Sequence, residues 1–141
     1  KNFNYLKDIV FKTYFEEGNI LNKNSSLNWK DSVLINLNDI QLIREDNNIN
    51  FVGTIKLDFI DVDSFYRQYQ IKRSNKKRIK NVNFDFFLDL TENQIQFDNL
   101  KIDGLSNKIT DDYLNNFNSR KLNIFNKVIF KNSIKEFFGN I

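Results

Sequence analysis

The stretch that decides the fold is Ile49-Asn50-Phe51-Val52-Gly53-Thr54-Ile55-Lys56-Leu57-Asp58-Phe59, in which apolar and polar side chains alternate. Alternation with a period of two places successive side chains on opposite faces, so the stretch predicts a β-strand with one apolar face. That face consists of Ile49, Phe51, Ile55, Leu57 and Phe59. At about 3.3 Å per residue the strand is roughly 36 Å long, about twice the usual length. Val52 breaks the alternation, and Gly53 indicates a bulge or a close backbone approach.

A second long run of alternation follows further along the chain. Its apolar face consists of Val82, Phe84, Phe86, Leu88 and Leu90. After the turn signal Glu92-Asn93, the alternation continues through Ile95 and Phe97 and then slips register around Asp98-Asn99. A slip of this kind indicates a β-bulge. Residues 82–90 and 94–103 are therefore predicted to form a hairpin.

Upstream of the deciding stretch, Val33, Ile35 and Leu37 alternate, and the pattern slips in the same way to reach Ile40. Shorter apolar patterns at 27–29 and 9–15 predict further strands before it. The chain is thus expected to contain five to seven antiparallel strands joined by Asn-rich turns.

Three segments have helical spacing instead. They are 62–72 after Asp61, 111–118 after Thr110, and 126–138 beginning at Asn126. The Asp61 side chain can accept hydrogen bonds from the first free amides of a helix, so Asp61 is a predicted N-cap, and helix capping is also the simplest interpretation of Asp111-Asp112. The expected fold class is mainly β or α+β: one domain over 1–141, with long antiparallel strands in a curved sheet or groove and two to three helices in connections and at the C-terminus.

The composition excludes several kinds of chemistry. The 141 residues include no Ala, Pro, His, Cys or Met. Without His or Cys the chain has no Ser/His/Asp or Cys/His nucleophile system, no usual zinc site and no disulfide. Acidic pairs such as Asp61 with Asp63 are explained by helix capping, and Asp85 with Asp89 by the solvent face of a strand. We therefore expect a protein without catalytic residues, metal or cofactor. Because the chain begins at Lys1 and lacks Met, we also expect it to be part of a longer chain.

Net charge is +3, but the positive charge is local. Six basic residues fall within nine positions: Lys72, Arg73, Lys76, Lys77, Arg78 and Lys80. The rest of the chain carries 15 basic and 18 acidic residues. A solvated helix end and loop is the simplest interpretation of this basic segment, and contact with an anionic lipid surface is the favoured functional one. Nucleic-acid binding, which predicts steeply salt-dependent affinity, is less favoured because the segment has no aromatic residue for stacking bases.

The one-sided apolar strands leave two interpretations open. Helices and other strands cover the apolar faces, which gives an ordinary closed core for a structural or protein-interaction domain, or the faces line a groove with an apolar occupant. In the second case the residues expected to face lipid are Val33, Ile35, Leu37, Ile49, Phe51, Ile55, Leu57, Phe59, Val82, Phe84, Phe86, Leu88, Leu90, Ile95 and Phe97.

The stretch from Ser26 to Gly104 resembles the C-terminal region of AsmA-like proteins. The segments that carry the resemblance are 26–31 (Ser-Leu-Asn-Trp-Lys-Asp), 33–37, 50–55 (Asn-Phe-Val-Gly-Thr-Ile), 61–66 (Asp-Val-Asp-Ser-Phe-Tyr), 69–71 with its basic tail, and 95–104. The closing segments 117–118 and 126–130 also fit this pattern.

The resemblance implies a periplasmic, β-rich, grooved domain of a Gram-negative envelope protein that is anchored in the inner membrane. Such proteins are similar to TamB and to bridge-like lipid transfer proteins, and they are implicated in phospholipid transport and outer-membrane assembly. The implied partners are phospholipid acyl chains, the rest of the parent chain and other envelope proteins, with no nucleic acid. The membrane anchor would lie in a segment absent from this sequence.

Overall fold

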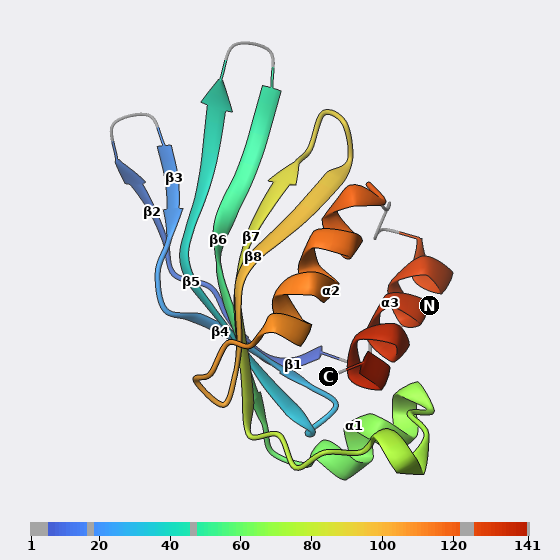
Figure 1. Cartoon of the computed structure of the whole chain (residues 1–141). Helices are drawn as coiled ribbons and strands as arrows, with labels where there is room; N and C mark the ends of the chain where they lie inside the picture. Colours follow the sequence, from blue (N-terminus) through green and yellow to red (C-terminus); the bar gives the residue numbers. More distant parts are fainter. Residues whose placement is uncertain (1–5, 17–18, 46–47, 122–125, 141) are drawn as a thin grey trace.

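The computed structural model describes residues 6–16, 19–45, 48–121 and 126–140, which form a curved, open antiparallel sheet with helices beside it (Figure 1). The strands are β1 (Leu6–Val10), β2 (Thr13–Glu16), β3 (Asn19–Asn22), β4 (Ser25–Trp29), β5 (Val33–Glu45), β6 (Asn48–Phe59), β7 (Asn81–Asp89) and β8 (Gln94–Ile102). The helices are α1 (Val62–Tyr69), α2 (Lys108–Ser119) and α3 (Lys127–Asn140), with a 3₁₀ turn, η1 (Arg73–Asn75). The mainly-β prediction is confirmed.

The described strands number eight rather than five to seven, because two rows of the sheet are each divided into two short strands. One row consists of β1 and β2, and the other consists of β3 and β4. β4 pairs with the first half of β5, and β3 pairs with its second half beyond residue 39. β1 and β2 pair in turn with β4 and β3. The 9–15 pattern is therefore two short strands, separated at Lys12, whose amide donates to the Ser25 hydroxyl at 3.0 Å. The sequence Glu17-Gly18-Asn19 predicts a turn after this pattern, and residues 17–18 of that turn lie outside the described residues.

Three β-bulges bend the sheet, and two of them are the register slips predicted from sequence. The pairing of β5 with β6 shifts at Asp39, and that of β8 with β7 shifts at Asn99. A third shift lies at Asp8 in β1. All three residues have φ near +50°, a conformation that Asp and Asn tolerate better than other side chains. An extra residue in one strand increases local twist and bending, which accounts for the curvature of the sheet.

Gly53 in β6 lies opposite the β5 bulge. A Cβ at this position would clash with the Ile40 side chain and lie 3.0 Å from Ile40 Cα and 3.2 Å from the Asn38 carbonyl oxygen. The predicted close backbone approach is therefore confirmed.

The three helices begin at polar caps. Asp61 accepts from the Ser64 amide at 2.9 Å, and Asn126 accepts from the amides of Val128 and Ile129. The predicted start of the second helix is wrong. α2 begins at Lys108, and Asn107 forms a capping box with Thr110, because the Asn-x-x-Thr pair satisfies two free amides where Thr110 alone satisfies one. The first helix also ends at Tyr69 rather than 72, since Gln70 takes a left-handed conformation.

Candidate functional site

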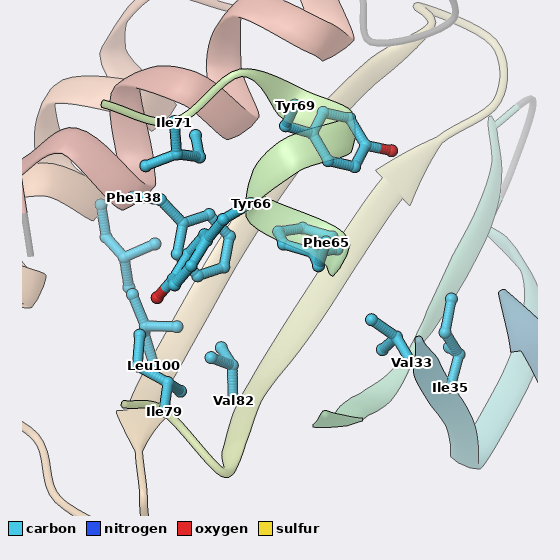
Figure 2. Close-up of a cluster of buried hydrophobic side chains, with 11 residues drawn as sticks. Val33, Ile35, Phe65, Tyr66, Tyr69, Ile71, Ile79, Val82, Leu100 and Phe138 are labelled. Carbon is cyan, nitrogen blue, oxygen red and sulfur yellow. The ribbon is translucent and has the colours of Figure 1, made fainter. Parts of the chain in front are cut away.

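The helices face the concave side of the sheet and rest on it through aromatic contacts. Phe59 of β6 meets Phe65 of α1 with ring centroids 5.1 Å apart, and Phe97 of β8 meets Phe117 of α2 at 5.2 Å. Trp29 of β4 stacks on Phe130 of α3 at 6.2 Å. Figure 2 shows the α1 end of this arrangement, where the α1 side chains gather with Phe138 above the sheet.

Between these contacts lies a cavity of about 280 Å³. Its floor comes from the sheet: Trp29, Val33, Ile35, Ile55, Leu57, Val82, Phe84, Ile95, Phe97 and Leu100. Its other walls come from the helices: Phe65, Tyr113, Leu114, Phe117, Phe130, Ser133, Ile134, Phe137 and Phe138. Floor residues such as Ile55, Leu57 and Phe84 lie at the centre of the sheet, yet they are only half-buried because they face this space. The helices thus cover the sheet without filling the volume beneath them.

The polar groups of the cavity wall are few, and most are already engaged. The Tyr113 hydroxyl donates to the Ser133 carbonyl oxygen at 3.1 Å, and the Ser133 hydroxyl donates to that of Ile129 at 3.0 Å. Burial raises the pKa of Tyr113 to about 12, so the phenol is neutral at physiological pH. The Trp29 indole N–H is buried and has no acceptor among the described residues. This wall suits a hydrocarbon and offers a charged group no compensation.

The residues predicted to face lipid divide into three groups. The cavity floor takes eight of them: Val33, Ile35, Ile55, Leu57, Val82, Phe84, Ile95 and Phe97. Five pack around it on the same face: Leu37, Phe51, Phe59, Phe86 and Leu88. Ile49 and Leu90 lie at the far end of the sheet, where they are 42% and 40% exposed. An open groove along the whole face is therefore not what the structure shows, because side chains of all three helices, among them Phe65, Phe117 and Phe130, line the space above its floor.

Sequence reasoning missed the helical half of the cavity. The one-sided spacing of Phe130, Ile134 and Phe137 was a usable signal, since an amphipathic helix must lay its apolar face on something. Spacing does not show whether that face touches the sheet or stands away from it. Val52, the exception in the alternation, lies on the convex face beside Phe87 of β7.

The acidic residues considered in the sequence form no site. Asp85 lies on the convex face and accepts from the Thr54 hydroxyl at 2.7 Å and the Asn99 amide at 2.6 Å. Asp61 caps α1, whereas Asp111 lies in the first turn of α2 and does not cap it. Across the described part of the chain, no group of three potential metal ligands comes together.

The basic segment, defined as Lys72, Arg73, Lys76, Lys77, Arg78 and Lys80, connects α1 to β7. Ile71 and Ile79 anchor it in the core, being 7% and 5% exposed, and the Tyr66 hydroxyl donates to the Lys77 carbonyl oxygen at 2.8 Å. It lies outside the cavity wall.

Comparison with protein-family models, curated protein sequences and solved structures finds no match to this chain. Within the described ranges, none of the helices has the length and apolar character needed to cross a bilayer.

Proposed function

We propose that this chain is a non-enzymatic lipid-binding domain that holds an acyl chain between the concave face of its sheet and the helices. The observation that carries the proposal is the apolar cavity of about 280 Å³ at the centre of the domain. Ligand sites in proteins are commonly concave, mainly apolar and roughly 300–1,000 Å³ in volume. The cavity lies at the lower end of this range, and its wall selects by apolar contact rather than by hydrogen bonding.

The apolar character of the lining favours an apolar occupant. The cavity is lined almost wholly by aliphatic and aromatic side chains, with Ser133 the one small polar residue among them. Removing such apolar surface from water stabilises a complex by about 25 cal/mol per Å². A hydrocarbon that fills the space gains this stabilisation.

The volume also limits the ligand. A methylene group is about as large as a water molecule, which occupies roughly 30 Å³. The cavity therefore takes on the order of nine methylene groups, and burying them contributes about 7 kcal/mol before the costs of binding. A longer acyl chain would protrude, and its polar head would stay in water because the wall has no charged group to pair with it.

The cavity and the long one-sided strands together support placing the domain in an AsmA-like envelope protein. In this proposal the domain works in the periplasm, tethered to the inner membrane through a segment outside this sequence. It contributes to phospholipid transport or outer-membrane assembly with the rest of the parent chain and other envelope proteins. The helices would form one wall of this part of the apolar path.

Photo-crosslinking tests the proposal with a matched pair of positions on one strand. Phe84 of β7 lines the cavity, whereas Phe87 lies on the convex face and is 39% exposed. A photoreactive phenylalanine analogue at 84 should capture lipid in cells, and the same analogue at 87 should not. Mass spectrometry of the purified domain should also find about one lipid per chain. Lipid-free protein with no adduct at 84 would instead establish a closed structural core.

A further inference from the structure

The basic segment places six cations at one end of the sheet. Their side chains make no hydrogen bond or ion pair with any described residue, and five of the six residues are exposed. Residues between them anchor the segment: the Asn75 side-chain amide donates to the Gly139 carbonyl oxygen of α3 at 3.2 Å, and Ile79 is buried. The segment therefore presents positive charge from a fixed position.

Two exposed apolar side chains flank the same segment. Ile60 is 65% exposed and follows Phe59, whose amide donates to the Lys80 carbonyl oxygen at 2.8 Å. On the other side, Leu105 is 72% exposed and follows Asp103, whose amide donates to the Asn81 carbonyl oxygen at 3.0 Å. These short backbone bonds bring three connections, β6–α1, α1–β7 and β8–α2, to one end of the sheet (Figure 1).

The carboxylates of these connections leave the positive charge largely uncompensated. Asp103 accepts from the backbone amides of Lys80 and Asn81 at 2.8 Å each, so it is turned onto the backbone rather than onto a cation. Asp61 is occupied by its helix cap, where hydrogen bonds from Ser64 lower its pKa. Among the described residues, Asp63 in the first turn of α1 forms no ion pair with the basic segment.

We propose that this end of the domain, formed by the basic segment with Ile60 and Leu105, docks on an anionic bilayer surface. Lys and Arg side chains near an anionic leaflet each raise membrane partitioning by roughly fivefold. Exposed aliphatic side chains beside them insert into the interface and strengthen binding. This combination of free cations and projecting apolar groups matches a lipid surface in both charge and polarity.

The same surface fits a nucleic acid less well. Single-stranded nucleic acids bind where exposed aromatic rings stack on bases between cationic side chains. The aromatic residues next to the segment are Tyr66 and Tyr69, and both are in the core at 1% and 6% exposure. Ile60 and Leu105 offer neither a base-stacking face nor a phosphate contact.

Docking would also orient the cavity, a consequence that rests on the proposed function. The basic segment adjoins α1 and the end of α3, and these helices supply Phe65 and Phe138 to the cavity wall. The bilayer would then lie against the α1 end of the cavity. A chain with an occupied cavity would meet the membrane at that end.

Vesicle co-sedimentation tests the docking surface. The purified chain should bind phosphatidylglycerol/phosphatidylcholine vesicles and not vesicles of phosphatidylcholine alone, and added salt should weaken binding. The triple variant Lys76→Gln/Lys77→Gln/Arg78→Gln should bind on the order of 100-fold more weakly. The matched control, Lys12→Gln/Lys23→Gln/Lys121→Gln, removes the same charge from exposed positions elsewhere and should bind within about threefold of the unmodified chain.

Replacing Ile60 and Leu105 by Ser separates docking from general polyanion binding. The double variant should lose vesicle affinity while its weak binding to a single-stranded RNA homopolymer stays unchanged. Equal effects of the basic triple and its control, or RNA binding as tight as vesicle binding, would overturn the proposal. Retention of cavity lipid in a variant that no longer sediments would show that lipid binding does not depend on docking. Unchanged urea midpoints would confirm that the variants fold.

Discussion

Ser133 offers the sharpest test of the cavity, because it is the smallest side chain in the wall. It lies in α3 among Phe130, Ile134 and Phe137, and its hydroxyl serves only its own helix. Replacing Ser133 by Phe adds five heavy atoms pointing into the space. Since each is somewhat smaller than a water molecule of roughly 30 Å³, the ring removes on the order of 100 Å³. That is about a third of the cavity volume.

Two effects of opposite sign follow from this one change. Burying a Phe side chain that would otherwise be exposed contributes about 2 kcal/mol, so the free energy of unfolding of the lipid-free protein should rise by up to about that amount. The bound chain loses room for about three methylene groups at about 0.8 kcal/mol each. Its affinity should therefore fall by roughly 50-fold. A closed core without a ligand predicts the first effect and not the second.

The assay compares delipidated Ser133→Phe protein with the unmodified chain. Urea unfolding gives the stability, and titration with a fluorescent fatty acid gives the affinity. Asn132→Phe is the matched control, because Asn132 is the preceding residue of α3 and is exposed. It should change neither quantity appreciably. If Ser133→Phe stabilises the protein and binds the fatty acid as tightly as before, the cavity is not the ligand site.

Three further outcomes concern the fold around the cavity. The Asn118 side chain accepts from the Phe97 amide of the edge strand β8 at 3.0 Å and donates to the Phe97 carbonyl oxygen at 2.9 Å. Asn118→Leu should therefore lower the free energy of unfolding in urea by about 2–3 kcal/mol. The exposed control Asn116→Leu should change it by less than about 0.5 kcal/mol. Gly53→Ala should cost about 1–3 kcal/mol in urea unfolding, because the added Cβ would clash with the Ile40 side chain and lie 3.0 Å from Ile40 Cα; a loss below about 0.5 kcal/mol would contradict this reasoning. Burial raises the pKa of Tyr113 in the folded protein from 10.0 to about 12, so the neutral phenol stabilises the folded state fully below pH 10 and progressively less as the pH rises towards 12. Tyr113→Phe should therefore make the free energy of unfolding, measured with urea, depend less steeply on pH over this interval. An unchanged slope would contradict the assignment.

Much of the sheet was predictable because a strand leaves its alternating pattern in consecutive residues of the sequence. The alternation around Gly53 and the slips at Asp39 and Asn99 correspond to a long strand, a close approach and two bulges. Side-chain alternation follows from backbone geometry alone, and an extra residue in the pattern leaves a visible change of phase. The break at Lys12 was not predictable, because it depends on which partner strand each half meets.

The candidate site was only half predictable. Eight of the ten strand residues of the cavity floor were identified because they share the apolar face of the sheet. The helical residues opposite them were expected to pack, but their distance from the sheet has no local signature. It is determined by contacts between residues far apart in the chain, such as Trp29 with Phe130.

The sequence by itself determined that this protein is a curved antiparallel sheet with one apolar face, helices beside it, and neither His nor Cys for catalysis. Only the tertiary structure decided what covers that face. The helices meet the sheet through aromatic contacts such as Phe59 with Phe65 and Phe97 with Phe117, and a cavity remains above the aliphatic side chains Ile55 and Leu57. A cavity arises there because packing depends on the sizes of side chains that meet in space, and periodicity records only which face each one occupies.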